Sequence, residues 1–128
     1  MKGIWILLTG LLVASAHPAN ADDVTNGNEQ AVIIHFKYGS TDLKPLFALE
    51  DKLESTVKGA GVGVLDGDEI ANDGRDGDIY LYGQNADRLF DAIRPVLMAS
   101  PFMKGAQVTR RYGPPGESTR QVVSVIDQ

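Results

Sequence analysis

The feature that most constrains the fold of this chain is the order of its strand-like and helix-like segments between Ala31 and Ile126. Two segments repeat apolar residues every three or four positions, which is typical of a helix with one buried face. Five shorter segments are rich in β-branched and aromatic residues, which is typical of strands. The strand-like segments are 31–38, 62–71, 78–82, 106–112 and 120–126.

Both helical segments begin and end at recognisable signals. The first follows Ser40-Thr41-Asp42, which we expect to cap it, and ends at two glycines. The second follows Asn85 and contains Pro95, near which we expect a kink or an end. The apolar stripes are Leu46, Leu49, Leu53 and Val57 in the first segment, and Ala86, Leu89, Phe90, Ile93 and Leu97 in the second.

The turn residues indicate which strands pair. Segments 62–71 and 78–82 form a hairpin across the Asp- and Gly-rich residues 72–77, with a bulge at Asp66-Gly67. The last two strands pair across Gly113-Pro114-Pro115-Gly116. The order βαββαβ with an extra C-terminal strand predicts an α+β, ferredoxin-like fold, in which two helices cover one face of an antiparallel sheet.

The first 21 residues have the layout of a secretory signal peptide. Lys2 precedes an apolar run from Ile4 to Ala16, and Ala19-Asn20-Ala21 offers small residues for cleavage. The run is shorter than the roughly 20 residues that a membrane-spanning helix needs. We therefore expect cleavage after Ala21, or alternatively after Ala16. The mature protein would then lie in the periplasm or outside the cell, with no membrane attachment.

The rest of the chain divides into a flexible polar tail, residues 22–30, and one domain, residues 31–128. The chain has no cysteine, which excludes disulfides, thiol catalysis and cysteine ligation of metals. Its formal net charge of −5 repels a phosphate backbone, so nucleic acid is disfavoured as a partner.

Acidic residues gather between the second and third strand-like segments. Carboxylate oxygens on a Gly-rich loop suit Ca²⁺, so one hypothesis is a calcium or small-ligand module here, with no other cofactor implied. The spacing does not match the EF-hand loop, however, and Asp and Gly also form turns without binding anything. The residues concerned are Asp66, Asp68, Glu69, Asp73, Asp76 and Asp78.

His35 is the one histidine that remains after cleavage at Ala21. A catalytic histidine needs a nucleophile and an orienting carboxylate, and the sequence identifies neither. No Gly-x-Ser-x-Gly elbow or His-Glu-x-x-His pair is present. A small hydrolase-type enzyme that uses His35 is the third hypothesis. The simpler interpretation is that His35 is a half-exposed residue of the sheet.

Strand alternation gives the sheet a candidate binding face. It puts His35 with Lys37 on one face of the first strand, and Tyr80 with Tyr82 on one face of the third. In a ferredoxin-like sheet these strands are neighbours. If both pairs face away from the helices, they form an aromatic and basic patch, which suits a protein partner or a homodimer because tyrosine is favoured at interfaces. The alternatives are base stacking on RNA, which the acidic charge opposes, and a covered or ordinary solvated sheet.

A second basic spot follows the fourth strand. This spot could bind a carboxylate or a phosphate. It consists of Arg110, Arg111 and Tyr112, with Arg120 across the Gly-Pro-Pro-Gly turn. The alternative, which we favour, is cross-strand pairing of these arginines with Glu117 or a nearby aspartate.

Four short segments together resemble the sequence pattern of a known protein family. They are Phe36-Lys37-Tyr38-Gly39; Tyr82-Gly83 with Ala86-Asp87 and Leu89-Phe90; Arg94-Pro95-Val96-Leu97 with Ser100-Pro101-Phe102; and Arg111-Tyr112-Gly113-Pro114-Pro115. On these residues the chain resembles a family of small bacterial proteins that are usually described as uncharacterised. The resemblance covers residues 31–126 and implies a compact α+β unit, without any activity or functional residue. The relatives lack an exported N-terminus, in which this chain departs from them.

The leading functional hypothesis is an exported, non-enzymatic binding protein that recognises another protein through the open sheet face or the acidic hairpin. An inhibitor or an immunity protein would be one form of this. Small size, the absence of cysteine and the lack of catalytic spacing favour it. The calcium or small-ligand module and the His35 enzyme are the two alternatives.

Overall fold

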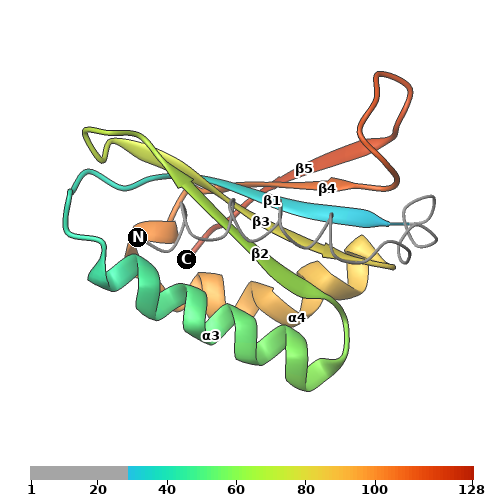
Figure 1. The fold of residues 1–128 in the computed structure, drawn as a ribbon, viewed down its shortest axis with the longest axis horizontal. Helices are drawn as coiled ribbons and strands as arrows, with labels where there is room; N and C mark the ends of the chain where they lie inside the picture. Colours follow the sequence, from blue (N-terminus) through green and yellow to red (C-terminus); the bar gives the residue numbers. More distant parts are fainter. Residues whose placement is uncertain (1–28) are drawn as a thin grey trace, which may run out of the picture.

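The computed structural model describes residues 29–128 (Figure 1). The predicted signal peptide and residues 22–28 of the predicted tail lie outside the described residues. The described part is α+β, with two helices and a five-stranded antiparallel sheet, as the sequence predicts. Both helices lie on the same face of the sheet (Figure 1). No helix among these residues is long and apolar enough to cross a membrane.

The sheet has the strand order β2-β3-β1-β4-β5, and every neighbouring pair is antiparallel. Strand β1 is therefore central, while β2 and β5 form the two edges. The strands are β1 (Gln30–Lys37), β2 (Val64–Ile70), β3 (Asp76–Gly83), β4 (Gln107–Arg111) and β5 (Gln121–Val125).

Helix α3 (Lys44–Ala60) buries the predicted stripe of leucines and Val57 against the sheet. Its N-cap is Leu43 rather than one of residues 40–42, so the predicted side-chain cap is wrong in detail. Asp42 still contributes, because its Oδ1 accepts a hydrogen bond from the Lys44 N–H at 3.1 Å. The helix ends at Gly61, whose φ of 67° is the left-handed conformation that glycine adopts readily.

Helix α4 (Ala86–Met98) is capped as predicted by Asn85, whose Oδ1 accepts a hydrogen bond from the Arg88 N–H at 3.0 Å. The Ala86 N–H donates to Oε1 of Gln30 at 2.8 Å, which ties the start of the helix to β1. Pro95 lies inside the helix, which continues to Met98. A 3₁₀ turn, η1 (Pro101–Met103), then leads toward β4.

The predicted bulge in β2 is confirmed. The register between β2 and β3 shifts between Leu65 and Gly67, so Asp66 is the extra residue. Beyond the bulge, Asp68 lies opposite Ile79 and therefore shares the buried face of the sheet. Gly67, with φ of 151°, lies opposite Tyr80 on the other face.

The hydrophobic core fills the space between the helices and one face of the sheet. Burial alternates along β1, where Val32, Ile34 and Phe36 are inside while His35 and Lys37 are exposed. Helix residues and the 3₁₀ turn close the other side of the core. The main contributors beyond β1 are Leu46, Leu53, Val57, Ile79, Leu81, Leu89, Ile93, Leu97, Met103 and Val108.

Candidate functional site

The face of the sheet opposite α3 and α4 contains most of the side chains that the sequence marks as candidates. We call it the outer face. Its rows run across the strands in register, because residues paired between antiparallel strands point to the same side. One row contains Gln107, His35, Asp78 and Glu69. The next contains Val123, Thr109, Ile33 and Tyr80.

Large apolar side chains are exposed on this face. Val64 is 60% exposed, Val123 is 58% exposed and Val125 is 60% exposed. Isolated exposed valines are ordinary, but these three lie on the same face as half-buried Ile33 and Tyr80. The outer face is therefore partly apolar. Strand alternation could have predicted this from the three valines and Ile33.

Tyr80 and Tyr82 lie on the outer face, as the alternation predicts, and both are half-buried. The Tyr80 hydroxyl donates a hydrogen bond to Oε1 of Glu69 at 2.9 Å. Burial, reinforced by that hydrogen bond, raises the pKa of Tyr80. Burial, reinforced by the Asp66 charge, raises the pKa of Tyr82. Both phenols therefore stay protonated at neutral pH and offer an apolar ring with a polar tip.

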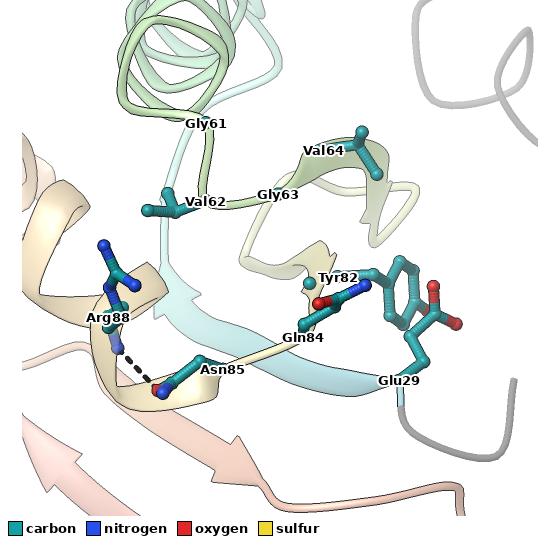
Figure 2. Close-up of a pocket in the computed structure, with 10 residues that line it drawn as sticks. Glu29, Gly61, Val62, Gly63, Val64, Tyr82, Gln84, Asn85 and Arg88 are labelled. Atoms are coloured by element: carbon teal, nitrogen blue, oxygen red, sulfur yellow. Dashed lines mark hydrogen bonds between the residues drawn. The ribbon is translucent and has the colours of Figure 1, made fainter. Parts of the chain in front are cut away.

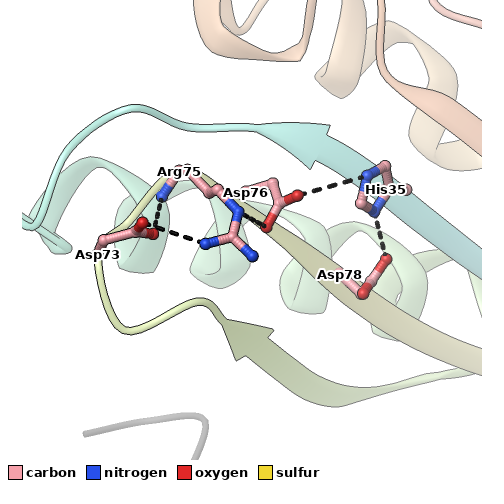
Figure 3. Close-up of polar contacts among 5 residues, drawn as sticks. All are labelled: His35, Asp73, Arg75, Asp76 and Asp78. Carbon is pink, nitrogen blue, oxygen red and sulfur yellow. Dashed lines mark hydrogen bonds and ion pairs between the residues drawn. The ribbon is translucent and has the colours of Figure 1, made fainter.

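His35 has two carboxylates beside it (Figure 3). Its Nδ1 lies 2.9 Å from Oδ1 of Asp78, the residue opposite it on β3. Its Nε2 lies 4.0 Å from Oδ2 of Asp76. The carboxylate that catalysis would require is thus present, but both ring nitrogens face carboxylates on an exposed surface. The enzyme hypothesis stays a prediction, since no nucleophile contacts the ring in the described part of the chain.

The five aspartates of the predicted calcium site do not converge. Arg75 pairs with Asp73 at 3.1 Å and with Asp76 at 3.9 Å (Figure 3). Asp68 is buried on the helix side, while partial burial raises the pKa of the Asp66 carboxyl. Within residues 29–128, no three side chains of the kind that bind metals lie together. The calcium module stays a prediction that this geometry does not favour.

Arg110 and Arg111, predicted to form one basic spot, lie on opposite faces of the sheet. Arg110 pairs in register with buried Val32, and its Nη1 donates to Oδ1 of Asp87 at 2.9 Å. Its guanidinium lies 5.0 Å from the ring centre of Phe90 on α4. Arg111 instead donates from Nε to the Gly113 carbonyl at 2.8 Å. Strand alternation puts neighbouring residues on opposite faces, so Arg110 and Arg111 cannot bind one ligand together.

Tyr112 contacts the same aspartate as Arg110, whereas Arg111 does not. Its hydroxyl donates a hydrogen bond to Oδ1 of Asp87 at 2.6 Å, and the Arg120 guanidinium lies 4.4 Å from the centre of its ring. The hydrogen bond from Tyr112, reinforced by Arg110, holds the pKa of the Asp87 carboxyl below its usual value. Of these arginines, Arg110 pairs with an aspartate, and that aspartate, Asp87, comes from α4 and not from a neighbouring strand.

A pocket of about 650 Å³ lies where β2 starts and β3 ends (Figure 2). Its walls include the loop Gly61–Val64, the residues Tyr82–Asn85, and the side chains of Glu29 and Arg88. The two backbone segments are in close contact, because a Cβ on Gly63 would lie 2.3 Å from the Tyr82 carbonyl oxygen. His35 is not among the residues that line this pocket.

Comparison of the chain with protein-family models, with curated proteins and with solved structures finds no match. The resemblance to small bacterial proteins therefore stays a prediction, and the function is inferred from the sequence and the geometry.

Proposed function

We propose that this protein is an exported, non-enzymatic binding protein that recognises another protein through the outer face of its sheet. The observation that carries the proposal is the composition of that face. Exposed Val123 lies in one row of this face with Ile33 and Tyr80, and exposed Val125 lies in the neighbouring row with His35. No helix of residues 29–128 covers these rows. Tyrosines and apolar side chains next to charged groups are typical of protein-binding surfaces.

We further propose that the fold is ferredoxin-like, with β5 added beside β4. The support is the strand order β2-β3-β1-β4, together with two helices on one face. In that arrangement the two central strands, β1 and β3, present their alternate residues at the middle of the uncovered face. A partner that docks there contacts His35, Tyr80 and Tyr82.

The chemistry of the partner follows from charge. Glu69, Asp76 and Asp78 add carboxylates to one side of the outer face, and the chain has a formal net charge of −5. Lys37 and Arg111 offset only part of this charge. A partner with a basic and partly apolar surface is therefore favoured, because complementary charge speeds encounter and excludes acidic competitors. An inhibitor or an immunity protein that occupies a basic binding cleft has this form.

A capture experiment tests the binding proposal. The mature protein, coupled to a resin, is offered the periplasmic and secreted proteins of its own cell, and the bound proteins are identified by mass. We expect a basic partner that Tyr80→Ala and Tyr82→Ala release. Glu54→Ala, an exposed residue on α3, is the matched control and should retain the partner. Equal capture by all variants would exclude the outer face as the binding surface.

Export has its own test. Support for it comes from the charged start, the apolar run and the small residues that end at Ala21. Fractionation should find the protein in the periplasm or the medium, and N-terminal sequencing should begin at Asp22, or at His17 for the alternative site. A protein that stays inside the cell with Met1 intact would remove this part of the proposal.

A further inference from the structure

Strand β5 is an edge strand without the usual protection against pairing. Among residues 29–128 it pairs with β4 on one side and with no strand on the other (Figure 1). Its sequence, Gln-Val-Val-Ser-Val, contains no charge, no proline and no glycine, and its register with β4 is regular. Natural edge strands usually carry charges, prolines or bulges that discourage the addition of another strand.

The opposite edge of the same sheet shows what protection looks like. Strand β2 carries Asp66, Asp68 and Glu69 within seven residues, and the bulge interrupts its register. The two edge strands of this sheet, β2 and β5, therefore differ in their protection against the addition of another strand. One edge resists strand addition, while the other is neutral, regular and apolar.

The backbone groups of β5 that point outward can be identified. The Tyr112 N–H donates to the Arg120 carbonyl, and the Ile126 N–H donates to the Ala106 carbonyl. Hydrogen bonding alternates along an antiparallel strand, so the even-numbered residues of β5 face β4. The N–H and C=O groups of Gln121, Val123 and Val125 therefore point to the free edge.

We propose that two copies of this chain pair through β5, antiparallel, about a two-fold axis at Val123. Val123 of one copy then lies opposite Val123 of the other, and Gln121 lies opposite Val125. Every residue in these pairs has its backbone groups turned outward, so each pair can exchange two hydrogen bonds. The five strands of each copy join into one continuous sheet.

A second copy fits this edge better than an unrelated strand does. The pairing is self-complementary, as a two-fold interface requires. All five residues of β5 are uncharged, so antiparallel pairing of two copies places no like charges opposite each other. Val123, which is 58% exposed, gains Val123 of the other copy as a directly opposed apolar neighbour, and Val125, which is 60% exposed, gains the same residue as a diagonal neighbour.

This inference goes beyond the proposed function and does not depend on it. Edge pairing leaves the outer face uncovered and makes it continuous across the two copies. The contact is small, so we expect a dissociation constant of roughly micromolar size rather than nanomolar.

Sedimentation of the protein, purified in the form that its own cell makes, over a range of concentrations tests the pairing. We expect a monomer–dimer equilibrium that Val123→Lys weakens about tenfold or more, because two ammonium groups would then face each other across the axis. Val64→Lys is the matched control, since Val64 is equally exposed but belongs to the protected edge. A monomer at all concentrations, or a dimer that Val64→Lys disrupts and Val123→Lys spares, overturns the proposal.

Cysteine cross-linking tests the register and does not depend on a charged variant that folds. The chain has no cysteine of its own, so a single cysteine can form only an intermolecular disulfide. Opposed residues of a hydrogen-bonded pair have Cα atoms about 5.5 Å apart, which a disulfide can span. Val125→Cys places the two cysteines four residues apart along the strands, roughly 13 Å. We expect Val123→Cys to cross-link rapidly under mild oxidation and Val125→Cys to remain uncross-linked. Equal rates for the two variants would overturn the two-fold register.

Discussion

Asp87 and Tyr112, 25 positions apart in the chain, meet through a hydrogen bond of 2.6 Å from the tyrosine hydroxyl to Oδ1 of the aspartate. The same oxygen accepts a hydrogen bond from Arg110 at 2.9 Å. One carboxylate in the first turn of α4 therefore holds the end of β4 and the residue that follows it. Its position near the helix N-terminus also suits its negative charge.

Asp87→Asn should lower the melting temperature at neutral pH. The folded protein holds the pKa of Asp87 below its ordinary 3.8, so the ionised carboxylate stabilises the fold above that pH. This contribution disappears as the pH falls through the lower pKa of the folded state. The gap in melting temperature between wild type and Asp87→Asn should therefore close in acid. Thermal unfolding followed by circular dichroism, at pH 7 and well below pH 3.8, measures both gaps.

A neighbouring carboxylate serves as the control for that experiment. Asp91 is exposed one helical turn later on α4, and Asp91→Asn removes the same charge. Tyr112→Phe should reproduce part of the effect of Asp87→Asn. If Asp91→Asn shows the same pH-dependent gap, the hydrogen bonds of Asp87 are not its cause.

Strand alternation and helical periodicity predict most of this fold, because both patterns are local. The leucine stripe of α3 and the cap at Asn85 are read from adjacent residues, as are the bulge at Asp66-Gly67 and the hairpin that follows it. The same alternation predicts that His35 and Tyr80 share the face opposite the core, as they do.

Contacts between distant elements are what the sequence cannot predict. Arg110 and Arg111 are neighbours in the chain, so they read as one basic spot, yet only Arg110 reaches Asp87. The partner of His35 depends on the register of β1 against β3, which brings in Asp78 rather than the residues before or after it. Charge in a sequence shows which groups exist, whereas register and helix packing decide which of them meet.

Asp78→Asn should change the free energy of unfolding by less than about 1 kcal/mol, the usual limit for an exposed ion pair. The side chains of His35 and Asp78 are 47% and 33% exposed, so water screens much of their attraction. Urea unfolding of the wild type, Asp78→Asn and His35→Ala measures the effect. A loss of several kcal/mol in either variant would mean that this pair is structural rather than part of a solvated surface.

Added calcium should leave the melting temperature unchanged. Asp73 and Asp76 pair with Arg75, Asp78 pairs with His35, and Asp68 is buried on the other face. A cation would have to break these contacts and gather side chains from both faces of the sheet. Thermal unfolding in millimolar CaCl₂, in MgCl₂ as an ionic-strength control, and in EDTA decides the matter. A rise specific to Ca²⁺ and reversed by EDTA would restore the calcium hypothesis.

Two glycines should respond to alanine in opposite directions. A Cβ on Gly83 would lie 2.3 Å from the Val62 carbonyl oxygen, where the end of β3 meets the residues before β2 at the pocket. Gly83→Ala should therefore destabilise the fold by about 1–3 kcal/mol, as overpacking does.

Gly59 lies inside α3, and a Cβ added there would have no neighbouring atom within 4 Å. Gly59 is the second-last residue of the helix, where only part of the helix-interior preference for alanine applies, so Gly59→Ala should stabilise the fold by about 0.5 kcal/mol. Chemical denaturation of both variants measures the two shifts. Equal effects would mean that the contact between residues 62–63 and 82–83 gives way easily, and that the pocket wall it forms is not rigid.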